Sequence, residues 1–117
     1  MGIIHYILNN AAHFPDKSAL VLDNQTLTYA QVVERTRKLS GALSLLGVGD
    51  GVHVGLLLGN SLEFVIILLA AADLGATVVP MDSSISNRDL ITAINATDIK
   101  YIIGQNSILK KAFQNSQ

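Results

Sequence analysis

The architecture follows from residues 52–80, which run VHVGLLLGNSLEFVIILLAAADLGATVVP. Residues 52–58 form a compact apolar run bordered by glycines, which predicts a buried strand. Residues 61–74 carry apolar side chains in nearly every direction, a pattern typical of a helix that is buried on all sides. Gly75 predicts the end of that helix, and residues 76–80 predict the next strand. Strand, helix and strand in this order indicate a right-handed βαβ unit on a parallel sheet.

The N-terminal part of the chain predicts a helix followed by a hairpin. Residues 3–12 place apolar side chains at helical spacing, and residues 18–22 and 25–28 predict two short strands. Asp23 and Asn24 lie between these strands and suit a tight turn, because both residue types tolerate positive φ. We therefore expect a small antiparallel hairpin after a short amphipathic helix.

A second helix is predicted to begin at Thr28. Thr28 and Gln31, three residues later, can satisfy each other's backbone N–H groups as a capping box. Gly47 is a natural residue to end the helix, because glycine adopts the left-handed conformation that helix ends often need. The residues expected on its core-facing side are Val32, Thr36, Leu39, Leu43 and Leu46.

The apolar helix at residues 61–74 carries two further expectations. Asn60 and Glu63 have the spacing of a capping pair at its start. A helix that is apolar on all sides needs a covering layer on each side, or it exposes surface that favours aggregation or a partner. A chain of 117 residues is not expected to supply both layers.

The C-terminal part continues the alternation of helices and strands. Ser86 with Asp89 three residues later predicts the start of a helix, residues 100–104 predict a strand, and residues 107–113 predict a last short helix. The fold class is therefore α/β, with a largely parallel sheet, flanking helices and a small N-terminal hairpin. The apolar face expected for the helix after Ser86 consists of Leu90, Ile91 and Ile94.

Composition excludes several classes of function. The chain has 8 Lys+Arg against 9 Asp+Glu, so its formal net charge of −1 gives no basic surface for nucleic acid. It has no cysteine, which excludes disulfides and thiolate chemistry. Its most apolar run is interrupted by Glu63 and Asp73 and is shorter than the ~20 residues that span a bilayer. No secretory signal is recognisable, so the expected location is the cytoplasm.

No pattern in the chain assigns a catalytic, cofactor-binding or metal-binding residue. The glycine-rich residues 47–51 lack the spacing of a dinucleotide loop and follow a helix instead of a strand. The histidines share no metal-ligand spacing, the serines have no neighbouring histidine, and the aspartates fall in predicted turns. These residues are His5, His13, His53, Ser83, Ser84, Ser86, Asp16, Asp23, Asp50 and Asp82.

One hypothesis still places a ligand on this chain. Doubly wound sheets bind ligands outside the carboxyl ends of their strands. The loops that would then be involved are Gly59-Asn60-Ser61 and Met81-Asp82-Ser83. This hypothesis rests on analogy of fold alone.

An ordered set of short segments resembles a known family. The set is Phe14-Pro15-Asp16-Lys17-Ser18-Ala19-Leu20, Leu27-Thr28-Tyr29, Gly47-Val48, Asn60-Ser61-Leu62-Glu63-Phe64 and Gly75-Ala76-Thr77-Val78-Val79-Pro80. In this order and spacing it resembles the N-terminal region of the adenylate-forming (AMP-binding) superfamily. The segment around Asn60 is more similar to the acyl-CoA synthetase branch than to the peptide-synthetase branch, which implies a role in fatty acid metabolism.

The chain departs from the family pattern in two ways. Val52 and His53 stand where the family commonly has aspartate and arginine, which concerns the geometry of one loop. More importantly, the phosphate loop, the nucleotide-binding motifs and the catalytic lysine of the family lie downstream of the residues present. The resemblance implies ATP, Mg and CoA for a full-length enzyme, whereas no site residue can be transferred to this chain.

The resemblance implies that residues 1–117 are an incomplete N-terminal subdomain of an AMP-forming ligase, inactive alone. The expected partner is the rest of the ligase, or another copy that binds through the helix from Leu62 to Leu74. The alternative is a stand-alone truncated paralog that acts as a non-catalytic binding or assembly module. A coding sequence that continues beyond Gln117 favours the fragment, and a stop codon there favours the module.

Overall fold

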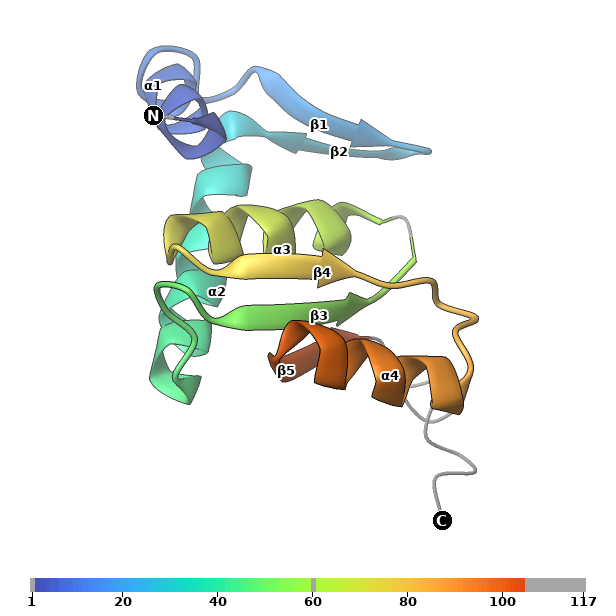
Figure 1. The fold of residues 1–117 in the computed structure, drawn as a ribbon. Helices are drawn as coiled ribbons and strands as arrows, with labels where there is room; N and C mark the ends of the chain where they lie inside the picture. The colour runs from blue at the N-terminus through green and yellow to red at the C-terminus, as the bar shows by residue number, and fades with distance from the viewer. Residues whose placement is uncertain (1, 60, 105–117) are drawn as a thin grey trace.

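The computed structural model describes residues 2–59 and 61–104, and its elements follow the predicted order (Figure 1). The helix expected at residues 107–113 lies outside the described residues. The observed elements are α1 (Ile3–His13), β1 (Ser18–Leu22), β2 (Gln25–Thr28), α2 (Tyr29–Leu46), β3 (His53–Leu57), α3 (Leu62–Asp73), β4 (Thr77–Pro80), α4 (Asn87–Thr97) and β5 (Ile99–Gly104).

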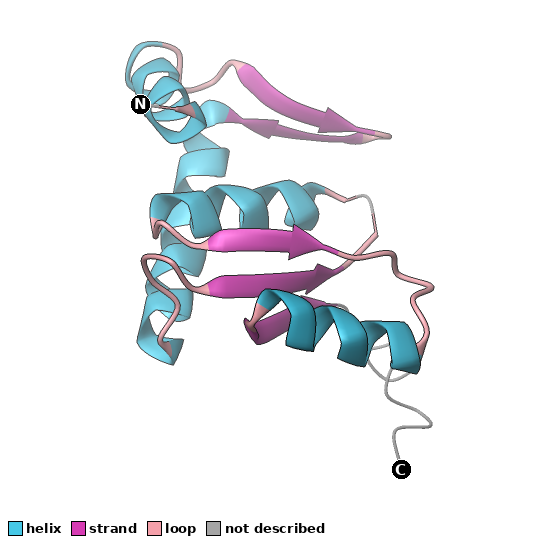
Figure 2. Ribbon diagram, in the orientation of Figure 1, coloured by secondary structure: helices cyan, strands magenta, loops and turns pink. Residues whose placement is uncertain are grey.

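The strands form two separate sheets, as Figure 2 shows. β1 and β2 make the antiparallel hairpin, with Asp23 at a φ of 53° in its turn. The other sheet has the order β4-β3-β5, and β3 runs parallel to both neighbours. Val54 in β3 lies opposite Val78 in β4 and Tyr101 in β5. The α/β fold class predicted from the sequence is confirmed.

Helices cover both faces of the parallel sheet. Val54 packs with residues of α2 and α3, whereas Leu57, three residues later in β3, packs with Leu90 of α4. Successive strand residues point to opposite faces, so α2 and α3 lie on one face and α4 on the other. This arrangement follows from the chain path, because the connection through α4 crosses from one edge strand to the other over β3.

The capping of α2 is as predicted. The Thr28 hydroxyl accepts from the backbone N–H of Gln31, and the Gln31 side chain accepts from the Thr28 N–H, at 3.2 and 2.9 Å. Gly47 ends the helix in the left-handed region with a φ of 107°. The expectation that Leu46 faces the core is wrong, because its side chain is 66% exposed. Its backbone carbonyl faces β5 instead, where it accepts from the Tyr101 hydroxyl at 2.7 Å.

Two expectations for α3 are wrong. Its N-cap is Ser61, whose hydroxyl accepts from the backbone N–H of Phe64 at 3.1 Å, and not Asn60. The chain also supplies a layer on both sides, because the short hairpin provides the second one. Leu62 packs in a cluster with Leu27 of the hairpin, whereas Ala70 packs against the parallel sheet. The buried residues of α3 are Leu62, Ile66, Ile67, Leu69, Ala70 and Ala71.

α4 is held to the sheet by a narrow contact. Leu90 is fully buried and is the one buried residue of this helix. The expectation that Ile91 shares this face is wrong, since Ile91 is 48% exposed. An amphipathic helix at the periphery buries a narrow stripe, and a residue about 100° further around the helix lies outside it.

Candidate functional site

The structure brings the two candidate loops to the same edge of the sheet. β3 and β4 are parallel neighbours, so the loops that follow them meet at their carboxyl ends. Leu56 lies opposite Pro80, and the backbone N–H of Met81 donates to the Leu56 carbonyl oxygen at 2.9 Å. Asn60, the middle residue of the first loop, lies outside the described residues.

The carboxylate of the second loop is engaged by its own turn. Asp82 Oδ1 accepts from the backbone N–H of Ser84 at 2.9 Å and from the Ser84 hydroxyl at 2.8 Å. These hydrogen bonds favour the charged form and lower the pKa of Asp82 below the usual range of a carboxyl. The stabilisation is therefore present at neutral pH and is lost as the pH falls through the lowered pKa.

Two other serines at this edge, Ser61 and Ser86, act as helix N-caps. Ser61 caps α3, and the Ser86 hydroxyl accepts from the backbone N–H of Asp89 at 3.1 Å at the start of α4. A capping hydroxyl satisfies one of the helix's free N–H groups, which is a structural role. This edge of the sheet therefore presents an anionic side chain and capping hydroxyls.

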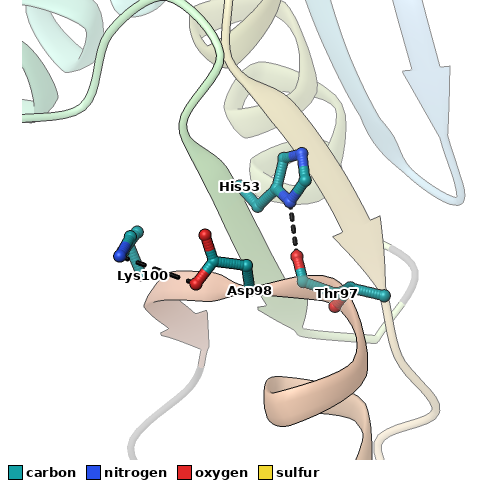
Figure 3. A network of polar contacts seen from close by, with 4 residues as sticks. All are labelled: His53, Thr97, Asp98 and Lys100. Carbon is teal, nitrogen blue, oxygen red and sulfur yellow. Dashed lines mark hydrogen bonds and ion pairs between the residues drawn. The ribbon is translucent and has the colours of Figure 1, made fainter.

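His53 belongs to a polar network at the opposite end of β3 (Figure 3). Its Nδ1 donates to the carbonyl oxygen of Thr97, the last residue of α4. Asp98 follows in the left-handed region at a φ of 52°, and its carboxylate lies 3.5 Å from the Lys100 ammonium. Both charged side chains are well exposed, so this ion pair contributes little stability. The network ties the end of α4 to the start of β3.

The remaining histidines and the glycine-rich loop do not meet at a site. His13 Nδ1 contacts the Asn9 carbonyl oxygen at 2.9 Å within α1, and His5 is exposed on the same helix. Gly51 donates its N–H to the Gly75 carbonyl oxygen at 3.0 Å, which ties two loops together. Among residues 2–59 and 61–104, no three His, Cys, Asp or Glu residues gather where they could hold a metal ion.

The structure contains a hollow that sequence reasoning missed. It has a volume of about 70 Å³ and lies beneath α1, between α2 and α3. The sequence carried no signal for it, because its walls come from three helices that are distant along the chain. Thr36 is buried there, and its hydroxyl has no hydrogen-bond partner among the residues that the structure describes. The lining residues are Ile4, Ile7, Leu8, Val33, Thr36, Arg37, Leu69 and Asp73.

We expect Thr36→Val to raise the free energy of unfolding by about 1 kcal/mol, because it removes a buried hydroxyl without a partner and keeps the side-chain shape. Urea unfolding followed by circular dichroism measures the change. Thr92→Val is the matched control, since the exposed Thr92 hydroxyl donates to the Arg88 carbonyl oxygen at 3.0 Å. A loss of stability in Thr36→Val equal to that in the control would contradict the expectation.

No helix in the described part of the chain is both long and apolar enough to cross a membrane. The longest described helix, α2, has a mixed polar and apolar sequence.

Solved structures share this fold. The N-terminal subdomain of NpsA from Klebsiella oxytoca, in complex with anthranilyl-AMSN, matches with a TM-score of 0.81 and 26% identity. The match covers 89% of this chain and 27% of that one. The inhibitor-bound N-terminal domain of FACL13 from Mycobacterium tuberculosis matches with a TM-score of 0.81 and 27% identity, over 94% of this chain and 29% of that one.

Curated proteins show the same relationship in sequence. Tyrocidine synthase 3 of Brevibacillus parabrevis is 34% identical over 80 residues, which make up 68% of this chain and 1% of that protein. Syringomycin synthase SyrB1 of Pseudomonas syringae pv. syringae is 31% identical over 111 residues, 94% of this chain and 18% of that protein. The chain thus spans a small share of these relatives. The family model described as AMP-binding enzyme matches residues 7–117, and the chain belongs to this family.

Proposed function

We propose that this chain is the N-terminal part of a ligase that activates a carboxylate with ATP as an acyl-adenylate and passes the acyl group to a thiol. The family match over residues 7–117 carries the proposal, supported by the fold shared with N-terminal subdomains of 26–27% identity. Because the chain covers 27% of the NpsA subdomain, the reaction is a property of a longer assembly.

The described residues do not fit a nucleotide by themselves. Stabilising charge on a transferring phosphoryl group requires converging N–H donors, cations and usually a metal ion. The loop edge instead presents the Asp82 carboxylate, and the hydroxyls of Ser61 and Ser86 are engaged in caps. ATP, Mg and CoA are therefore proposed for the rest of the ligase and not for this chain.

The substrate class has two candidates. The segment from Asn60 to Phe64 supports an acyl-CoA synthetase, with a fatty or other organic acid as substrate. Several relatives instead carry names of peptide synthases, such as tyrocidine synthase 3, which supports an amino acid. We keep the acyl-CoA type as the hypothesis, and a substrate panel that contains both classes separates the two.

We expect the isolated chain to show no ATP–pyrophosphate exchange above the protein-free rate with any carboxylate, because residues 2–59 and 61–104 present no phosphate-binding set. The panel contains straight-chain fatty acids, aromatic acids and the proteinogenic amino acids, each with ATP, magnesium and labelled pyrophosphate. Turnover with any of them would contradict the proposal that this chain alone is inactive.

A chimera tests whether this chain can form part of an adenylate-forming enzyme. The chain replaces the matching portion of the NpsA adenylation domain, and anthranilate, the acyl part of anthranilyl-AMSN, serves as substrate. Exchange by the chimera supports an adenylate-forming role. A folded chimera that gives no exchange contradicts it and favours the non-catalytic module.

A further inference from the structure

The hollow beneath α1 has an apolar interior. Ile7 of α1 and Leu69 of α3 are buried in its wall, and Val33 of α2 is half-buried there. Thr36 is also buried, with its hydroxyl oxygen covered by neighbouring atoms. Pockets that bind small molecules are mostly apolar and carry a few polar groups that orient the ligand. The interior of this hollow therefore favours an aliphatic group.

The volume of the hollow limits the size of that aliphatic group. A cavity of ~150 Å³ holds the carbon ring of benzene. The hollow has a volume of about 70 Å³, roughly half of that, and so fits a chain of about three or four carbon atoms. A larger group would require the three helices to move apart.

Two charges of opposite sign lie at the rim of the hollow. Arg37 on α2 and Asp73 on α3 both line it, and both are exposed. Within residues 2–59 and 61–104, neither of them forms an ion pair with another side chain. Both charges are therefore available to a molecule whose aliphatic part enters the hollow.

The end of α3 strengthens the attraction for a cation on one side of the rim. Asp73 is the last residue of α3, and the last turn of this helix contains no basic residue. The free carbonyl groups at a helix C-terminus carry partial negative charge, which favours a nearby cation. A cationic group is thus favoured beside Asp73 and an anionic group beside Arg37.

We propose that the hollow binds a small aliphatic zwitterion, in which one carbon atom carries an ammonium group, a carboxylate and a branched chain of about three or four carbon atoms. The chain lies between Ile7, Val33 and Leu69, the carboxylate lies beside Arg37, and the ammonium group lies beside Asp73. L-Valine and L-leucine have this chemistry. Binding here requires no ATP and is independent of the proposed ligase reaction.

A titration of the purified chain tests which parts of the ligand are recognised. L-Leucine is added without ATP, and binding is followed by the amide NMR spectrum, where we expect saturable shifts in α1, α2 and α3 around the hollow. Glycine keeps both charges without the chain and is expected to bind about tenfold more weakly or worse. Isoamylamine and isocaproate each keep the chain with one charge, and each should bind about two- to fivefold more weakly, as for a lost exposed ion pair.

Two variants test the roles of the charged residues at the rim. Arg37→Gln should weaken L-leucine and isocaproate by about two- to fivefold and leave isoamylamine no weaker. Asp73→Asn should weaken L-leucine and isoamylamine by the same factor and leave isocaproate no weaker. Arg35→Gln is the matched control, because Arg35 is an exposed arginine of the same helix that does not line the hollow. Circular dichroism checks that each variant keeps its helix content.

Four results would overturn the proposal. They are the absence of saturable shifts with L-leucine, shifts that map away from the three helices, binding of glycine as tight as that of L-leucine, and an effect of Arg35→Gln equal to that of Arg37→Gln. Because none of these measurements contains ATP, failure here leaves the proposed ligase function intact. Failure of the NpsA chimera likewise leaves the binding site intact.

Discussion

Leu90→Ala is expected to lower the free energy of unfolding by about 2–5 kcal/mol, the range for a buried leucine that leaves a cavity. Leu90 is fully buried and packs with Leu57, which is also fully buried in β3. Because no other residue of α4 is buried, the helix loses its main contact with the sheet along with the leucine side chain. Urea unfolding followed by circular dichroism measures the change.

The neighbouring residue provides the control for Leu90. Ile91→Ala removes a similar side chain from a position that is 48% exposed, so its effect is expected within about 0.5 kcal/mol. Equal losses from both substitutions would contradict the expectation that the burial of Leu90 against the sheet sets the contribution of α4. Hydrogen exchange adds a local measurement, because Leu90→Ala should reduce protection in α4 more than in α2.

Gly47→Ala is expected to lower the free energy of unfolding by about 2–3 kcal/mol, as the sum of two effects. Gly47 has a φ of 107°, in the left-handed region that alanine adopts only with strain. A Cβ there would lie 2.5 Å from the Tyr101 hydroxyl oxygen, so the hydrogen bond from Tyr101 to the Leu46 carbonyl oxygen must shift. The strain and the lost hydrogen bond both act on the contact between α2 and β5.

Gly41→Ala is the matched substitution for Gly47. Gly41 lies inside α2, and a Cβ added there meets no atom within 4 Å. We expect this change to raise stability by about 0.5–1 kcal/mol, the difference in helix propensity between the two residues. Tyr101→Phe separates the two effects at Gly47, because it removes the hydrogen bond and introduces no backbone strain at that glycine. If Gly47→Ala lowers the free energy of unfolding by no more than Tyr101→Phe does, left-handed strain does not explain why glycine occupies position 47.

Local signals in the sequence predicted the elements well. Thr28 and Gln31 begin α2 as a capping box, and Gly47 ends it, because these residues act through backbone groups within a few positions. The order of strands and helices followed from apolar periodicity for the same reason. The one wrong cap, Asn60 in place of Ser61, arose where two adjacent residues have side chains that can cap a helix equally well.

The candidate site was less predictable. Asp82 and the loop after β3 could be placed at one edge of the sheet from the βαβ pattern, but the engagement of Asp82 by Ser84 could not. The family followed from an ordered set of segments and is confirmed by the match over residues 7–117. The acyl-CoA synthetase branch stays a prediction, because the residues that select a substrate act through a pocket, and pockets combine distant parts of a chain.

Periodicity and capping residues were sufficient for the α/β class and the parallel unit around β3, because each depends on residues close together or on their order. The AMP-binding family was indicated by the resemblance of an ordered set of segments. The burial of α3 from both sides depended on contacts between parts of the chain that are distant in the sequence. It required the hairpin to fold back over Leu62 while Ala70 packs on the sheet, and such long-range contacts leave no periodic signal. The hollow beneath α1 could not be predicted for the same reason, since its walls come from three helices that are distant along the chain.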